Sequence, residues 1–164
     1  MASAKENTRE IKKGNELLKD ATVEVGFLDN AFKSLAASIT AAFEEVVEGM
    51  DGVSTTSEKI AKSYERDIVG AIKASTRGLE DQINLQTKIN QGINVEKEIQ
   101  DKLDKAQTRR KLTIEKINQA NFLTQEQKKD LIEKAEDIFA AEEASLNKLK
   151  ENNAEAQRQK SIFQ

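Results

Sequence analysis

The sequence predicts an all-α protein in which long amphipathic helices form an elongated helical bundle or a coiled coil. Its 164 residues include no proline, the residue that most disrupts a helix because it lacks an N–H and clashes with the preceding turn. Apolar residues recur at steps of three and four along most of the chain, which is the period of a helix face. Charged residues make up 34% and aromatic residues only 4% of the sequence, as is typical of long helices rather than of a globule with an aromatic centre.

The first helix is predicted over residues 5–50. Eight large apolar side chains follow one another at steps of three or four, which places them on one stripe of the helix, as in the seam of a bundle. We expect this stripe to be the main interface or core of the protein. Its members are Val25, Leu28, Phe32, Leu35, Ile39, Phe43, Val46 and Met50.

Turn signals separate this N-terminal segment, residues 1–53, from the rest of the chain. Gly52 suits the left-handed position at which many helices end. Thr55 and Glu58 have the spacing of a capping box, in which each side chain bonds the backbone N–H of the other residue. Together these signals predict a turn rather than a continuous rod.

The central segment, residues 54–123, is predicted to form helices over 56–91 and 95–121. Gly92 and Asn94 suit a helix end and a new N-cap, but the apolar spacing runs almost unbroken past them, so both a break near 91–94 and an uninterrupted helix fit the sequence. Ser75 and Gln86 fall on the first stripe, where polar residues fix register at a cost in stability. The two stripes consist of Ile60, Tyr64, Ile68, Ile72, Ser75, Leu79, Ile83, Gln86, Ile89 and Ile93, and of Val95, Ile99, Leu103, Ala106, Arg110, Ile114, Ile117 and Asn121.

The C-terminal segment, residues 124–164, is predicted to be a helix over 125–158 followed by a polar tail. Thr124 and Gln127 form a capping box in its glutamine form, and Leu123 stands just outside it as a hydrophobic staple. The stripe of this helix runs through Ile132, Ala135, Phe139, Glu142, Leu146, Leu149, Asn153 and Ala156. We expect a second interface or core at Ile132, Phe139, Leu146 and Leu149.

The residue types present disfavour an enzyme. The chain has no histidine and no cysteine, and so lacks the commonest general base, the thiol nucleophile and the usual transition-metal ligands. The serines and threonines at 54–57 are explained by capping and turn formation. We therefore predict no catalytic, cofactor-binding or metal-binding residues and no cofactor.

Charged clusters have structural explanations as well. The carboxylate pairs Glu44/Glu48 and Glu133/Asp137 lie one helical turn apart, but a di-metal bundle would add histidines to them, so a solvated acidic face is favoured. In the basic run at 109–111, Arg110 lies at the edge of the seam, where we expect it to pair with an acidic residue of a neighbouring helix.

Nucleic-acid and membrane functions are disfavoured. The net charge of −3 lacks the basic excess of a nucleic-acid binder. No apolar run reaches the roughly 20 residues of a transmembrane helix, and Met1 to Lys13 do not resemble a secretory signal. The amphipathic stretch 25–50 carries an acidic polar face, whereas interfacial helices are typically cationic.

The proline-free helical composition, rich in Lys, Glu, Asn and Gln as at 146–160, resembles the coiled-coil parts of bacteriophage virion proteins, especially tail tape-measure proteins. The resemblance implies a long helical protein inside a tail, packed as several parallel copies against hub or tube proteins. The chain is short for a ruler and lacks the long hydrophobic segments such proteins often carry. It therefore suits a fragment of a longer protein, or a smaller neck, baseplate or internal virion component.

We accordingly expect a non-enzymatic structural protein whose helices pack with copies of itself, as a homo-oligomer, or with other structural proteins. Its location would be the virion if the phage resemblance holds and the cytoplasm otherwise. Two alternatives stay open: a soluble signalling or adaptor bundle, and a membrane-active helical protein.

Overall fold

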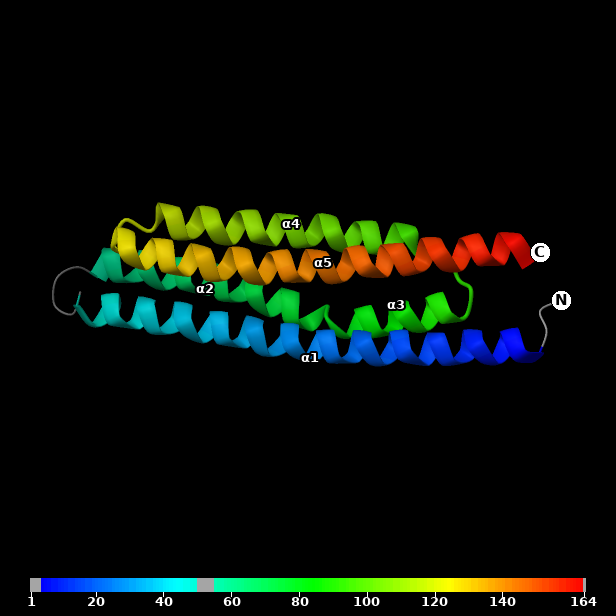
Figure 1. Ribbon diagram of the computed structural model, residues 1–164. Coiled ribbons are helices and arrows are strands. Elements are labelled where there is room, and N and C mark those ends of the chain that lie inside the picture. Colours follow the sequence, from blue (N-terminus) through cyan, green and yellow to red (C-terminus); the bar gives the residue numbers. More distant parts are fainter. Residues whose placement is uncertain (1–3, 50–54, 164) are drawn as a thin grey trace.

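The computed structural model describes residues 4–49 and 55–163, which form five helices. These are α1 (Ala4–Gly49), α2 (Thr55–Arg77), α3 (Glu80–Asn90), α4 (Glu96–Gln119) and α5 (Gln125–Phe163). The chain runs up and down along one axis, so that α2 and α3 return along α1, and α4 and α5 form a second antiparallel pair beside them (Figure 1). The all-α, elongated bundle predicted from composition and periodicity is confirmed.

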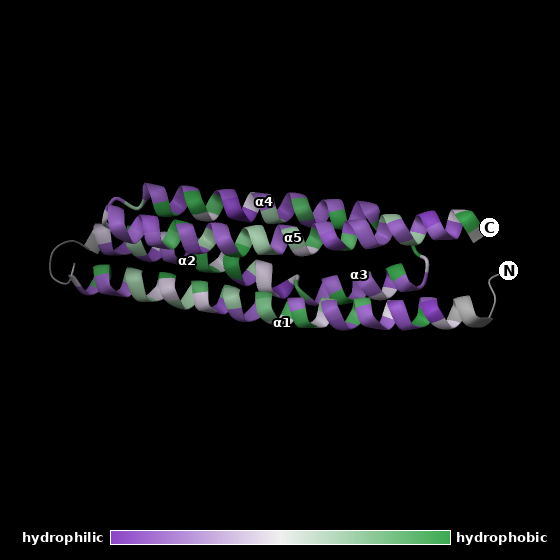
Figure 2. Cartoon of the chain, in the orientation of Figure 1, coloured by the Kyte–Doolittle hydropathy of each residue, from purple (hydrophilic) through white to green (hydrophobic). Residues whose placement is uncertain are grey.

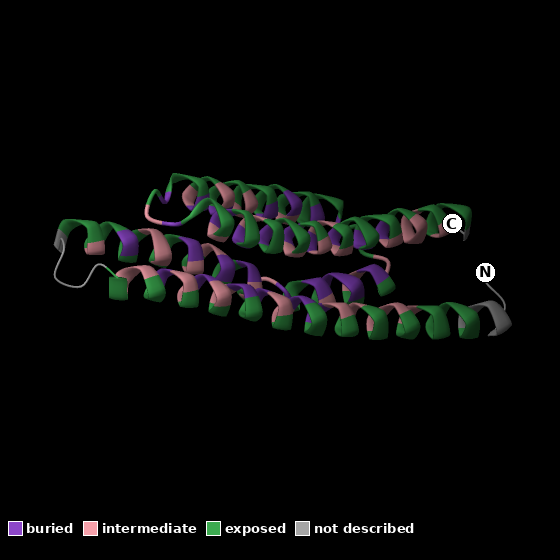
Figure 3. Ribbon diagram, turned by 60° about the vertical axis from the view of Figure 1, so that its left-hand side comes forward, coloured by how far each residue is buried: buried purple, intermediate pink, exposed green. Residues whose placement is uncertain are grey.

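The helices are long because one stripe of each is buried against its neighbours. α1 has 46 residues, a length of about 69 Å at 1.5 Å per residue, and packs on α2, α3 and α5. Apolar residues recur along the helices between polar ones (Figure 2), and the buried turns face the bundle interior (Figure 3). Tertiary packing of these stripes supplies most of the stability that such long helices need.

The core is divided into two apolar clusters along the bundle. The larger one joins α1, from Val25 to Phe43, to residues of α2, α4 and α5 such as Ile72, Ile117 and Phe139. The smaller one lies toward the end that holds both termini, and its buried members come from α3, α4, α5 and Val95. Among residues 8–24 of α1, whose side chains are described, none belongs to this second cluster.

The helix predicted over 56–91 is broken at Gly78 and Leu79, so that prediction of a single helix is wrong. Around the break the backbone N–H of Leu79 bonds the Thr76 carbonyl at 3.2 Å, and that of Gln82 bonds the Leu79 carbonyl at 3.0 Å. These three-residue steps replace the four-residue steps of an α-helix. The hydroxyl of Thr76 also donates to the Lys73 carbonyl at 2.8 Å, and such back-bonding beside a glycine is a common cause of helix kinks.

The remaining boundaries follow local signals in the sequence. Gly92 has φ +81°, a left-handed conformation that glycine adopts without strain, and the Ile93 N–H bonds the Lys88 carbonyl at 3.0 Å. The structure thus has a turn near 91–94 in place of an uninterrupted helix. At α5 the Thr124 N–H donates to Gln127 Oε1 at 2.9 Å and the Gln127 N–H donates to Thr124 Oγ1 at 3.0 Å, which confirms the capping box. The turn predicted at Gly52 lies outside the described residues.

Candidate functional site

The seam predicted on the first helix lies inside the bundle. Its residues from Val25 to Phe43 are buried, Val46 is half-buried, and Met50 lies outside the described residues. On α5, Phe139, Leu146 and Leu149 are buried and Ile132 is half-buried. Of the two roles expected for these side chains, interface or core, the structure places the buried ones in the core of a single chain.

Five of the seven aromatic residues pack against one another and join different elements of the bundle. Phe32 of α1 and Phe139 of α5 pack edge to face with ring centroids 5.3 Å apart. Phe43 makes the same kind of contact with Phe122 at 5.4 Å, and Tyr64 lies beside Phe122 at 6.0 Å. Edge-to-face pairs of this geometry add to the stabilisation from burial, so these rings fix α1 against α2 and α5.

A buried polar layer made of Ser75, Arg109 and Glu142 lies between the two apolar clusters. The Arg109 guanidinium donates to the Ser75 hydroxyl at 2.7 Å and to Glu142 Oε1 at 3.1 Å. The Glu142 side chain is only 4% exposed and that of Arg109 21%. Arg109 therefore supplies a half-buried cation to this layer. Arg110 pairs with Glu143 of α5 at 3.9 Å on the partly exposed surface, which confirms the predicted pairing of Arg110 with an acidic residue of a neighbouring helix.

The ionised form of Glu142 is unfavourable in this layer, because burial removes water from its carboxylate. Burial raises the pKa of the Glu142 carboxyl, and the neighbouring Arg109 acts in the opposite direction. Its second oxygen, Oε2, is buried and has no hydrogen-bond partner among the described residues. The layer thus links α2, α4 and α5 through an ion pair whose carboxylate is buried at a desolvation cost.

Further polar contacts continue along the interior toward the termini. The Ser145 hydroxyl donates to Gln82 Oε1, and the Asn152 amide donates to Gln86 Oε1 at 3.0 Å. Asn153 accepts the backbone N–H of Val95 at 3.1 Å, which gives the first turn of α4 a partner from α5. These contacts explain why Gln86, predicted on the stripe, is tolerated at a fully buried position.

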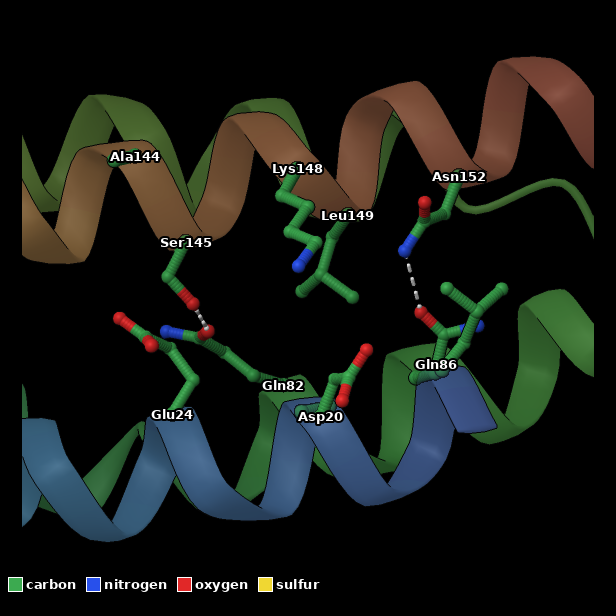
Figure 4. Close-up of a pocket in the computed structure, with 11 residues that line it drawn as sticks. Asp20, Glu24, Gln82, Gln86, Ala144, Ser145, Lys148, Leu149 and Asn152 are labelled. Atoms are coloured by element: carbon green, nitrogen blue, oxygen red, sulfur yellow. Dashed lines mark hydrogen bonds between the residues drawn. The ribbon is translucent and has the colours of Figure 1, made fainter. Parts of the chain in front are cut away.

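A shallow groove separates α1 from α5 in this half of the bundle. It encloses about 180 Å³, and its floor is formed by α3 through Gln82 and Gln86 (Figure 4). Asp20 of α1 faces Lys148 of α5 across it. None of the side chains between Thr8 and Glu24 is buried, so α1 is only loosely packed along this groove.

The outward face of α1 is the feature that the sequence analysis missed. It displays Val23 and Phe27, which are 66% and 60% exposed. From Ala21 to Phe43 the sequence has only three charged residues, and two of them, Asp29 and Lys33, pair with each other at 2.8 Å. A second run of steps of three and four, offset from the buried seam, was the signal that could have revealed this face.

No family model, curated protein or solved structure matches this chain. Within residues 4–49 and 55–163, no group of three or more acidic side chains is placed to hold a metal ion. Over the same ranges, none of the helices is long and apolar enough to cross a membrane.

Proposed function

We propose that this chain is a non-enzymatic structural component that packs side by side with other helical proteins in a larger assembly. The observation that carries the proposal is the outward face of α1, a nearly uncharged strip on the side of an elongated bundle. The predicted seam is used inside the chain, whereas this strip is exposed and available for lateral contacts. Exposed apolar patches of this kind are typical of protein–protein interaction sites.

The contrast with α4 supports the choice of face. α4 has 24 residues, and twelve of them are charged, among them Lys102, which binds Asp81 of α3 at 2.8 Å. Such a helix is well solvated on its outer side. A partner that covers α1 would instead bury Phe27 and Val23 at little desolvation cost, because few charges lie near them.

The most specific form of the proposal is a virion component of a bacteriophage, for which the support is the compositional resemblance to tape-measure-like proteins. An elongated bundle with α1 running its full length suits lateral packing in a tail, neck or baseplate. This form predicts that the chain is present in purified particles in a fixed number of copies.

The experiment is gradient sedimentation of assemblies from the native source, with the copy number of the chain measured by quantitative mass spectrometry. A fixed ratio to other components in a large particle is expected. Phe27→Glu should remove the chain from the particle, whereas Ile60→Glu, the same change at an exposed position of α2, should not.

Recovery of the wild-type chain only in small, exchanging complexes would overturn the proposal in favour of an adaptor bundle. Leakage of dye from liposomes exposed to the purified chain would instead favour a membrane-active protein. Particle incorporation that is equal for Phe27→Glu and the wild type would show that another face makes the contact.

A further inference from the structure

We propose that the outward face of α1 binds the same face of a second copy of this chain, with the two α1 helices antiparallel. The inference rests on the proposed function and names its first partner. One exposed stripe of α1, which we call the outer stripe, has an order of side chains that suits this pairing. The outer stripe consists of Lys12, Glu16, Lys19, Val23, Phe27, Asn30, Ser34, Ala37, Ala41, Glu44 and Glu48.

The outer stripe has the spacing of a helix-pairing seam. Its members follow one another at steps of three and four, and every one of them is exposed. The buried seam, from Val25 to Phe43, lies on the opposite side of the same helix. α1 is therefore built as a helix with two seams, one used inside the chain and one facing outward.

The apolar centre of the stripe is asymmetric in size. Its N-terminal half presents the large side chains of Val23 and Phe27, and its C-terminal half presents Ala37 and Ala41. In an antiparallel pair Val23 comes opposite Ala41 and Phe27 opposite Ala37, so each large residue meets a small one. In a parallel pair Phe27 would meet Phe27 and the alanines would face each other across a gap, which packs poorly.

The charged ends of the stripe are complementary in the same arrangement. The N-terminal end carries Lys12 and Lys19, and the C-terminal end carries Glu44 and Glu48 together with the neighbouring Glu45. With Val23 opposite Ala41, Lys19 lies beside Glu44 and Glu45 of the second copy. In the same register Glu16 comes level with Glu48, and the exposed Asp20 comes level with Glu44. Lys12, Lys13 and Lys19 outnumber these two carboxylates, so the N-terminal end is net basic opposite an acidic end.

The acidic end of α1 carries charges that are unfavourable at a helix C-terminus. The last turn of α1 contains no basic residue, although cations are favoured at that end of a helix and anions are not. Glu44 also lies near Glu65 of α2, where burial first and the Glu44 carboxylate second raise the pKa of Glu65. Lysines from an antiparallel partner would relieve this repulsion.

A second copy is favoured over an unrelated partner because the two halves of the stripe complement each other. A two-fold pair uses the same patch on both subunits, so each contact occurs twice. One register then places large side chains against small ones and the basic end of the stripe against the acidic end.

The test is charge reversal and rescue, measured with the purified full chain by sedimentation equilibrium over a range of concentrations. Lys19→Glu and Glu45→Lys should each weaken dimer formation, by about tenfold, since each reversal places like charges at two symmetric contacts. The double variant Lys19→Glu/Glu45→Lys should recover dimerisation. Residues 19 and 45 are about 39 Å apart along one helix, so recovery can arise only between copies.

Two matched variants address the apolar centre. Phe27→Glu should raise the dissociation constant at least about thirtyfold, because a charge is introduced twice into the centre of the contact. Ile60→Glu should leave it unchanged. Circular dichroism of each variant checks that helicity is retained.

Absence of rescue in the double variant, or a wild-type chain that stays monomeric at all concentrations, would overturn the antiparallel pair. The proposed function is tested separately by incorporation into particles. If Phe27→Glu removes the chain from particles while the purified wild type is monomeric, the outer stripe binds a different protein.

Discussion

Phe32→Ala compared with Phe27→Ala tests whether the predicted seam is a core within one chain. The two phenylalanines are five residues apart on α1, but Phe32 is 0% exposed and Phe27 is 60% exposed. Truncation of a fully buried ring loses about 150 Å² of apolar burial, which at about 25 cal/mol per Å² is about 4 kcal/mol. This agrees with the range of about 3–5 kcal/mol measured for such core truncations.

The expected result is a loss of about 3–5 kcal/mol in the free energy of unfolding for Phe32→Ala and less than about 0.5 kcal/mol for Phe27→Ala. Part of the loss, about 0.5–1.5 kcal/mol, comes from the edge-to-face contact with Phe139. A double-mutant cycle with Phe139→Ala isolates that part as a coupling energy.

The assay is urea unfolding followed by circular dichroism, at a protein concentration low enough to keep the chain monomeric. A lower midpoint with an unchanged slope reports lost stability. Equal losses at Phe27 and Phe32, or a Phe32→Ala chain that keeps its midpoint but changes its mass by light scattering, would refute the assignment of the seam to the core.

Four further substitutions test the turns, the helix cap and the polar layer. Gly92→Ala should destabilise the chain by about 1 kcal/mol because φ is positive there, whereas Gly70→Ala, in open space within α2, should stabilise it by about 0.5–1 kcal/mol, both measured by thermal unfolding. Thr124→Ala should cost about 1 kcal/mol by removing the capping bond to the Gln127 N–H, in the same assay. The wild-type chain should lose stability as pH rises above the ordinary carboxyl pKa of 4.5. Glu142→Gln should remove this decline, measured by urea unfolding across pH.

The sign of the pH effect follows from the direction of the pKa shift. The folded chain holds the Glu142 proton to a higher pH than the unfolded chain does, because burial raises the pKa of that carboxyl. Between the two pKa values the folded state binds more protons, so the free energy of unfolding falls as pH rises. A wild-type profile that rises through this window, or one that Glu142→Gln leaves unchanged, would contradict the account. Equal effects at Gly92 and Gly70, or an unaltered midpoint for Thr124→Ala, would contradict the turn and cap assignments.

The sequence predicted the parts of the fold that depend on local chemistry. The three- and four-residue spacing from Val25 to Phe43 located a buried stripe, since a helix repeats every 3.6 residues wherever it packs. The capping box at Thr124 located the start of α5, since both of its bonds form within one turn.

The break at Gly78 could not be predicted in the same way. The stripe continues through it, with Ser75 and Leu79 both buried, and a glycine in a helical pattern is usually tolerated. Two features of the break become visible only once the helices are assembled. The Thr76 hydroxyl bonds back to the helix before the break, and the neighbour changes there, because α2 packs on α4 whereas α3 packs on α5.

The features of the candidate site also divide into those that depend on local sequence and those that depend on the assembled fold. By itself the sequence determined that the chain is helical, that its seams are apolar, and that histidine and cysteine chemistry is absent, because these depend on residue type and spacing. Only the tertiary structure decided that the Val25–Phe43 seam faces inward, that Arg109 meets Glu142, and that Phe27 is left outside. An apolar stripe in the sequence shows that one face of a helix is packed. Which helix it packs against depends on the helices that the turns bring alongside it.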